Sequence, residues 1–105
     1  ILLLIKRSVQ YNITGTGALR VGFEFLKIHY KNSGDVYVSD PTWANHHNII
    51  KKAGFNIIKY PYWDPNTKGF DIESALECLS YAKEHSIVLL HVCAHNPTGV
   101  DPTEE

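Results

Sequence analysis

A polar turn that directly follows an apolar run contains the residues best placed to do chemistry. Residues 87–93 form a nearly continuous run of β-branched and apolar residues, and the sequence Ala-His-Asn-Pro-Thr-Gly follows at 94–99. Such a run predicts a strand that is covered on both faces, as in a parallel sheet. Ligands of parallel α/β sheets bind beyond the carboxyl ends of the strands. We therefore expect the amide of Asn96, whose backbone is restricted by Pro97, to donate a hydrogen bond to a ligand oxygen.

Three residues of this segment are also potential metal ligands. His91, Cys93 and His95 fall on one face of an extended strand, because side chains alternate between the two faces. The spacing argues against a shared ion, since His91 and His95 would lie about 13 Å apart in an extended strand. We expect no metal site, and we interpret the two histidines as buried side chains whose nitrogens are hydrogen-bonded.

The sequence Thr-Gly-Thr-Gly at 14–17 is a second candidate site, at the start of a predicted helix. Glycines let a ligand approach the backbone closely, and the N–H groups at a helix start favour an anion such as phosphate. The pattern is neither the dinucleotide fingerprint nor the P-loop, because Gly22 comes too late and no Gly-Lys-Ser/Thr follows. Two interpretations stay open, a phosphate-binding helix start and a plain glycine turn capped by threonine.

The third candidate site follows Pro41, at the end of another predicted strand. Trp43 can lay its ring on a planar ligand, or it can close the end of the hydrophobic core. His46 can orient another polar group of the site, or it can be a surface histidine at the start of a helix. The residue types alone leave both pairs of alternatives open.

Hydrophobic periodicity predicts the elements that must position these residues. The expected order is helix 16–30, strand 36–38, helix 44–53, strand 55–62, turn 64–69, a helix capped by Asp71, and strand 87–93. The first helix should bury Ala18, Leu19, Gly22, Phe25, Leu26 and His29. The last helix should bury Ile72, Ala75, Leu76 and Leu79, with Phe70 stapled against Ala75. This alternation is typical of a parallel, right-handed α/β layer.

Composition indicates part of one globular domain, and we interpret the chain as a piece of a longer protein. The 105 residues are 44% hydrophobic, with a formal net charge of −1 and scattered lysines and arginines, which argues against nucleic-acid binding. The apolar residues 1–5 are too few to span a membrane. Cys78 on a helix and Cys93 in a core strand are typical of reduced thiols. Neither a Ser-His-acid set nor a Cys-x-x-Cys motif supports hydrolytic or redox chemistry.

Four blocks of sequence resemble the aspartate aminotransferase family, in the same order and at matching separations. They are residues 14–20, residues 41–46, residues 62–71 and residues 91–102. The resemblance covers about residues 9–105 and implies that residues 1–105 are an incomplete part of the large domain of a fold type I pyridoxal-phosphate enzyme. It further implies a homodimer that exchanges an amino group between aspartate or glutamate and 2-oxo acids. Residues 1–8 do not follow the family pattern.

The resemblance implies roles for the candidate residues. Thr14, where serine is usual, would hold the cofactor phosphate together with Gly15 and Thr16. Trp43 would stack on the pyridine ring and touch the substrate carboxylate. Asn96 would bond the phenolic oxygen of the ring and also meet the substrate.

Two histidines and two prolines complete what the resemblance implies. His46 would support the aspartate that pairs with the pyridinium nitrogen. His91 would likewise support residues that contact the cofactor, without contacting it directly. The peptide bonds before Pro41 and Pro97 would be cis, a form that X–Pro bonds adopt readily.

The resemblance also places the reacting residues beyond Glu105. The Schiff-base lysine, the pyridinium-pairing aspartate, a tyrosine and the carboxylate-binding arginines would all lie there, and none of the eight lysines present stands in a matching motif. We expect the 105 residues to be inactive alone and not stably folded. A non-catalytic phosphate- or nucleotide-binding α/β module stays an alternative, as does a partial product without its own function. Both a cytoplasmic and a mitochondrial location stay open.

Overall fold

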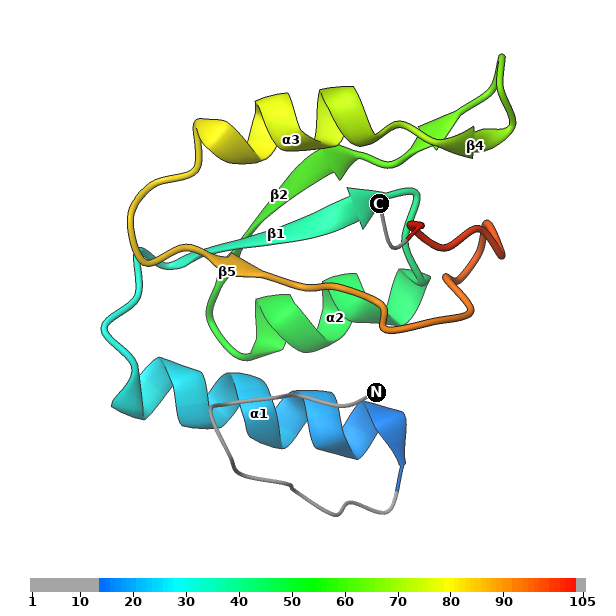
Figure 1. Cartoon of the computed structure of the whole chain (residues 1–105). Helices are drawn as coiled ribbons and strands as arrows, with labels where there is room; N and C mark the ends of the chain where they lie inside the picture. Colours follow the sequence, from blue (N-terminus) through cyan, green and yellow to red (C-terminus); the bar gives the residue numbers. More distant parts are fainter. Residues whose placement is uncertain (1–13, 104–105) are drawn as a thin grey trace.

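Strand β1 (Asp35–Asp40) is the centre of a three-stranded parallel sheet with the order β2-β1-β5. In the computed structural model, which describes residues 14–103, β1 pairs with β2 (Asn56–Pro61) along its whole length and with β5 (Ile87–Val88) over two residues. Helix α3 (Ile72–Ser80) lies on one face of the sheet, and α1 (Gly15–His29) and α2 (Ala44–Lys52) lie on the other (Figure 1). The predicted parallel α/β architecture is confirmed.

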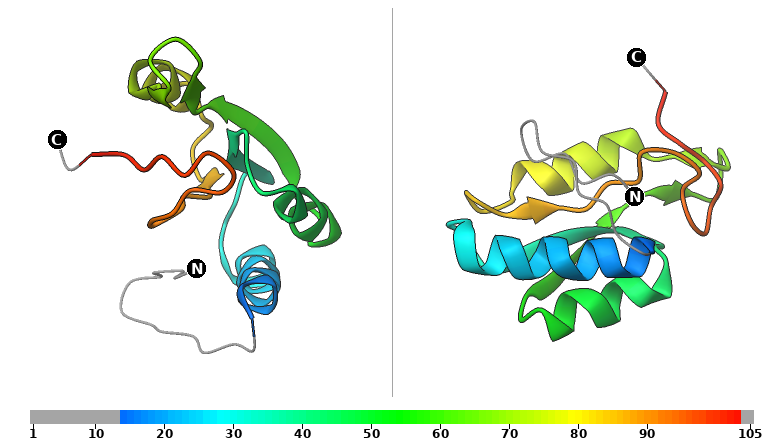
Figure 2. Two further views of the ribbon diagram at one scale, coloured as in Figure 1. Left: turned by 90° about the vertical axis from the view of Figure 1, so that its right-hand side faces the viewer. Right: turned by 90° about the horizontal axis from the view of Figure 1, so that it is seen from below.

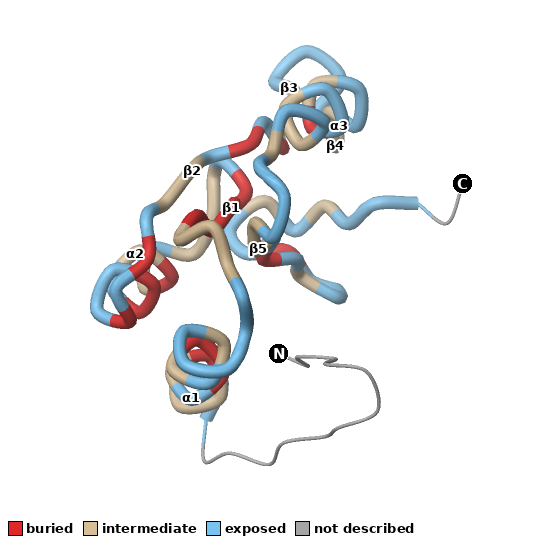
Figure 3. The backbone as a smooth tube through the Cα atoms, turned by 90° about the vertical axis from the view of Figure 1, so that its left-hand side faces the viewer, coloured by how far each residue is buried: buried red, intermediate tan, exposed pale blue. Residues whose placement is uncertain are grey.

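Two hydrophobic clusters hold the layers together, one on each side of β1. Side chains alternate along the strand, so Val36 and Val38 point to the face of α1 and α2, and Tyr37 points to the face of α3. Ile50, on α2, is fully buried in the first cluster, and Ala75, on α3, is buried in the second. Figure 3 shows the buried residues gathered along β1 and on the helix faces turned toward it.

Helix α1 buries a face that differs in part from the predicted one. Leu19, Gly22 and Phe23 are buried, whereas Phe25 is 48% exposed and His29 lies outside the core. Residues 19, 22, 23 and 26 follow the i, i+3, i+4, i+7 rule, so Phe23 and not Phe25 belongs to the inward face. The prediction that Phe25 and His29 are buried was therefore wrong, because the inward face of α1 contains Phe23 in place of Phe25.

Helix α3 is capped as predicted, because the Asp71 carboxylate accepts a hydrogen bond from the backbone N–H of Ser74 at 3.1 Å. Phe70 packs against the cluster that contains Ala75, as the predicted staple requires. The expected apolar face is only half covered, since Ile72 and Leu76 are exposed. Residues 64–69 form the predicted turn, which joins the short antiparallel strands β3 (Trp63–Asp64) and β4 (Gly69–Phe70).

The predicted strand 87–93 is wrong in length and in its coverage. Only Ile87 and Val88 form β5, and the chain leaves the sheet after Leu89, whose N–H donates to the carbonyl of Tyr37. Leu90 and Val92 are 62% and 70% exposed, because β5 is an edge strand with no described element over its outer side. Cys93 is likewise exposed and does not lie in a core strand. The expectations for residues 1–8 concern a segment outside the described residues.

Candidate functional site

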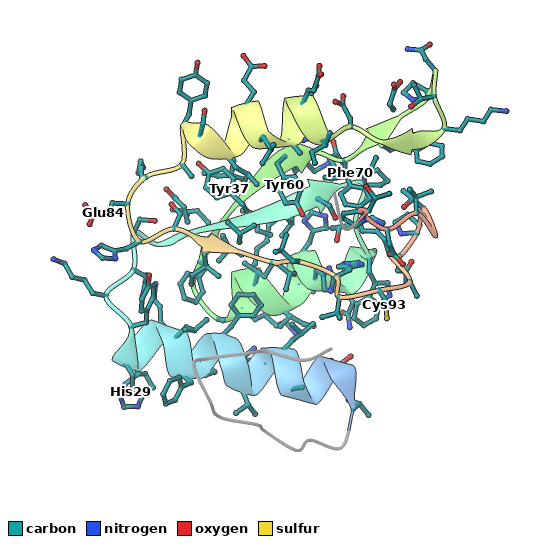
Figure 4. All side chains as sticks on the ribbon, in the orientation of Figure 1. His29, Tyr37, Tyr60, Phe70, Glu84 and Cys93 are labelled. Atoms are coloured by element: carbon teal, nitrogen blue, oxygen red, sulfur yellow. The ribbon has the colours of Figure 1, made fainter. Side chains whose placement is uncertain are left out.

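An open pocket of about 440 Å³ lies beyond the carboxyl end of β1. The start of α1, the start of α2 and the turn 91–101 all lie at this end of the sheet (Figures 1 and 2). Side chains from the segment before α2 and from the turn form its lining, which consists of Trp43, His46, Leu90, His91, Val92, Cys93, Ala94 and Asn96. Figure 4 shows Cys93 at this end of the molecule, away from the tyrosines that pack under α3.

The turn that carries Asn96 is held by one carboxylate. The two oxygens of Asp101 accept hydrogen bonds from the backbone N–H groups of Ala94 and His95, each at 2.8 Å, and these bonds hold the pKa of Asp101 below its usual range. Ala94 and Gly99 have positive φ angles of 50° and 69°, so the chain reverses between them. The Asn96–Pro97 peptide bond is cis, as the resemblance implied.

His95 lies in the middle of this turn, and both of its ring nitrogens are hydrogen-bonded. Nε2 lies 2.8 Å from Ser39 Oγ, and Nδ1 lies 2.7 Å from Thr98 Oγ1. Burial, with a smaller effect of His91, lowers the pKa of His95 to about 4, so the ring is neutral near pH 7. The expectation of a buried, hydrogen-bonded histidine is confirmed for His95.

The predicted separation of His91 and His95 is wrong. Their rings stack with centroids 4.3 Å apart, because the chain bends at Ala94 and is not extended there. Nδ1 of His91 accepts a hydrogen bond from the backbone N–H of Asn96 at 3.1 Å. Over residues 14–103, no group of three or more His, Cys, Asp or Glu side chains has an arrangement that could hold a metal ion.

His46 is a buried residue at the start of α2, with 1% of its surface exposed, so the surface alternative is wrong. Nδ1 lies 2.9 Å from Thr42 Oγ1, and burial, together with weaker effects of neighbouring histidines, lowers its pKa to about 4. The Nε2 atoms of His46 and of His91 are buried without a hydrogen-bond partner among the described residues. Buried polar atoms are normally satisfied, so two unpartnered nitrogens beside one pocket point to a polar group that is not among these residues.

Trp43 packs against the hydrophobic core, as one of its two alternatives predicted, and its stacking on a planar ligand stays a prediction. The ring packs against the core cluster under β1 and also lines the pocket, and the edge of one ring faces the other in the Trp43–His46 pair, at a centroid distance of 5.3 Å. The Asp40–Pro41 peptide bond that precedes it is cis, as the resemblance implied.

The segment 14–17 forms a capped and exposed helix start. Thr14 Oγ1 accepts a hydrogen bond from the N–H of Gly17 at 3.1 Å, which is the capping interaction of the simpler interpretation. The first N–H groups of any helix lack intrahelical acceptors, so the cap leaves donors for an anion. The segment does not line the pocket, but Asn45 Nδ2 lies 3.5 Å from Thr16 Oγ1 and links the starts of α1 and α2.

The structure thus gathers Trp43, His46, His91 and Asn96 around one pocket. Four residues that stabilise the turn without lining the pocket were not predicted from the sequence: Ser39, Tyr62, Thr98 and Asp101. An aspartate shortly after a turn that contains proline and glycine often accepts hydrogen bonds from backbone N–H groups of the turn, so Asp101 could have been selected from the sequence. The contact with Tyr62 joins residues far apart in the sequence and had no local signal.

Residues 5–105 match the family model described as aminotransferase class I and II. The chain belongs to the class I and II aminotransferase family. It is 54% identical over 93 residues to the mitochondrial aspartate aminotransferase of Xenopus tropicalis, and the aligned region covers 89% of this chain and 22% of that protein. It is 47% identical over 101 residues to the cytoplasmic aspartate aminotransferase of Dictyostelium discoideum, with 95% and 23% covered. The chain therefore spans about a fifth of the length of the curated relatives it matches.

Solved structures of class I and II aminotransferases have the same fold. A mitochondrial aspartate aminotransferase from Trypanosoma brucei superposes with a TM-score of 0.83 at 47% identity, covering 89% of this chain and 24% of that one. An aromatic-amino-acid aminotransferase from Burkholderia pseudomallei, covalently bound to pyridoxal phosphate, gives 0.80 at 42% identity, with 86% and 22% covered. Pyridoxal phosphate is the cofactor of this family. Among the helices of the described residues, none is both long and apolar enough to cross a membrane.

Proposed function

We propose that this chain forms part of the pyridoxal-phosphate site in the large domain of an aspartate aminotransferase. The reaction transfers the amino group of aspartate to 2-oxoglutarate and gives oxaloacetate and glutamate. The observation that carries the proposal is the convergence of an aromatic ring, Trp43, and an amide, Asn96, on one pocket at the carboxyl end of β1. A phosphate-binding module would need the helix start at 14–17 but neither of these side chains.

The residues present fit a planar, phosphorylated pyridine ring. The pocket is bounded by Trp43 on one side and by the turn of Asn96 on the other, and the exposed start of α1 lies at the same end of the sheet. In this proposal Thr14, Gly15 and Thr16 bind the phosphate, as helix starts do. When bound, pyridoxal phosphate supplies an electron sink for the carbanion that forms at the substrate Cα.

The side chains of the pocket have separate tasks in this proposal. Trp43 stacks on the cofactor ring and limits where the substrate carboxylate can lie. The Asn96 amide donates to the phenolic oxygen and meets the substrate. His46 and His91 remain neutral, since burial lowers the pKa of each, and His46 orients the acidic partner of the ring nitrogen through its unpartnered Nε2.

The remaining parts of the reaction come from outside these residues in our proposal. They include the lysine that binds the cofactor and moves the substrate proton, the arginines that bind the two substrate carboxylates, and the second subunit of a homodimer. The relatives include mitochondrial and cytoplasmic enzymes, and we propose one of these two locations for the parent protein.

The proposal is tested on the full-length protein that contains this chain. Asn96→Ala and Trp43→Phe should each lower aspartate:2-oxoglutarate turnover about tenfold, or about 1.4 kcal/mol, and change the absorption of the bound cofactor, because the first removes a hydrogen-bond donor and the second makes the stacked ring smaller. Asn66→Ala and Trp63→Phe, which change the same residue types in the β3–β4 hairpin, are the matched controls. Unchanged turnover and absorbance in both site variants would contradict the roles proposed for Trp43 and Asn96, whereas a full-length protein without transamination activity would favour the phosphate-binding module.

A further inference from the structure

Tyr62 lies outside the pocket but contacts both arms of the turn that carries Asn96. Its ring stacks on the ring of His95 with centroids 3.7 Å apart and planes only 10° from parallel. Its hydroxyl donates a hydrogen bond to the carbonyl of Val100 at 2.6 Å. His95 precedes the cis peptide bond and Val100 follows it, so this one side chain, 4% exposed, connects the segment between β2 and β3 to the turn on both sides of the cis bond.

The ring of His91 connects the ring of His95 to the backbone of Asn96. His95 lies between Tyr62 and His91, since it stacks on both. His95 cannot rotate freely, because each of its ring nitrogens is hydrogen-bonded to a hydroxyl group. His91 in turn accepts the backbone N–H of Asn96 at 3.1 Å. A displacement of the Tyr62 ring is therefore passed to the backbone of Asn96 through two packed imidazoles.

The side chain of Asn96 depends on this backbone for its position. Asn96 is exposed, and within residues 14–103 its only hydrogen bond to a side chain is made by its backbone N–H. We propose that Tyr62 is a positioning residue that holds the amide of Asn96 where it meets the phenolic oxygen of the cofactor. This inference rests on the function proposed above for Asn96.

A purely structural tyrosine would contribute to stability alone, and Tyr37 provides that comparison. Both tyrosines are buried in the same cluster under α3, with 6% of Tyr37 exposed. Tyr37 stacks on none of the rings of the turn, and its hydroxyl has no hydrogen bond to the turn within the described residues. Tyr37→Phe therefore controls for the loss of a phenol from this core.

The test uses the full-length protein loaded with pyridoxal phosphate and follows the pH at which the absorption band of the bound cofactor titrates. An amide donor stabilises the ionised phenolic oxygen, so its loss or displacement should move the titration midpoint to higher pH. We expect a shift of about one unit in Asn96→Ala, about half a unit in Tyr62→Leu and a smaller shift in Tyr62→Phe, which keeps the stacked ring. Tyr37→Phe should leave the midpoint unchanged. Thermal unfolding of the cofactor-free proteins records the stability of each variant separately.

Three outcomes separate the inference from the function on which it depends. A shifted midpoint in Asn96→Ala and in both Tyr62 variants supports the inference. A shift in Asn96→Ala with an unchanged midpoint in the Tyr62 variants overturns the inference and leaves the proposed function intact. An unchanged midpoint in Asn96→Ala overturns both. Should Tyr62→Leu fail to fold, Tyr62→Phe decides the matter alone, since loss of the bond to Val100 must still shift the midpoint.

Discussion

The three histidines of the site differ in how their ring nitrogens are satisfied. Both nitrogens of His95 bond hydroxyl groups, one of Ser39 on β1 and one of Thr98 in the turn, whereas His46 and His91 each keep one buried nitrogen without a partner among the described residues. The hydrogen-bonding capacity of the His95 ring is therefore fully used within these residues, and the function of the ring is to support the turn. The other two can each bond a polar group from outside the described residues, which our proposal requires of His46.

Neutral burial of His46 and His95 predicts a loss of stability in acid. Burial lowers the pKa of each to about 4, while the unfolded chain titrates near 6.5, so the unfolded state binds more protons between these values. The free energy of unfolding should be highest above pH 6.5, fall as the pH drops toward 4, and stop falling for this reason below 4. Urea unfolding of the cofactor-free full-length protein between pH 7.5 and 4 measures the dependence.

Replacement of His95 by Gln should make that dependence shallower, and the exposed His29 on α1 provides the comparison His29→Gln. An equally steep acid dependence in His95→Gln and in the unmodified protein would contradict the assignment of the acid sensitivity to buried neutral imidazoles.

At the scale of elements, the sequence predicted what is local and missed what depends on neighbours in space. The cap formed by Asp71 and the end of the helix predicted over 44–53, which Gly54 follows with a φ of 84°, both depend on nearby residues and were predicted. The inward turn of Phe23 in place of Phe25 depends on where β1 and β5 lie. The apolar run 87–93 reads as one strand, but the chain leaves the sheet after Leu89 and bends back at Ala94, whose N–H donates to Asp101.

The same division holds for the candidate site. Asn96 and Trp43 could be selected from the sequence, because each follows a predicted strand and lies within two residues of a proline. The stacking of His91 on His95 could not, since an extended chain would keep them apart. Tyr62 was invisible as a site residue, because its contacts join positions more than thirty residues apart.

The turn 91–101 is an element held largely by one carboxylate, which gives a prediction. Asp101→Ala removes two hydrogen bonds from the N–H groups of Ala94 and His95, and we expect several-fold weaker binding of pyridoxal phosphate to the full-length protein. Asp64→Ala is the matched control, because Asp64 accepts bonds from Asn66 and Thr67 in the other turn. Cofactor dissociation constants from absorbance titrations measure both. Equal affinities in the two variants would show that the turn does not need Asp101.

At the scale of the whole molecule, apolar side chains are exposed at the β5 edge of the sheet. Val88, Leu90 and Val92 are all exposed, and β5 has a free edge within the described residues. Exposed apolar edges favour association with other chains. A sheet whose edge strand exposes apolar side chains gains less from burial than a sheet whose edges are covered.

We therefore predict that the 105 residues expressed alone unfold without a cooperative transition and catalyse no transamination. Circular dichroism during heating measures the first property, and an aspartate:2-oxoglutarate assay with added pyridoxal phosphate measures the second. The full-length protein is the positive control for both. A sharp thermal transition, or measurable turnover, in the isolated chain would contradict the prediction.

The buried hydroxyl of Ser39 gives the two walls of the pocket a common foundation. Ser39 lies on β1, just before the segment that leads to Trp43, and its Oγ lies 2.8 Å from His95 in the turn of Asn96. The same buried serine therefore connects the strand that leads to Trp43 with the turn that carries Asn96, so a displacement of β1 at Ser39 would act on both sides of the pocket at once.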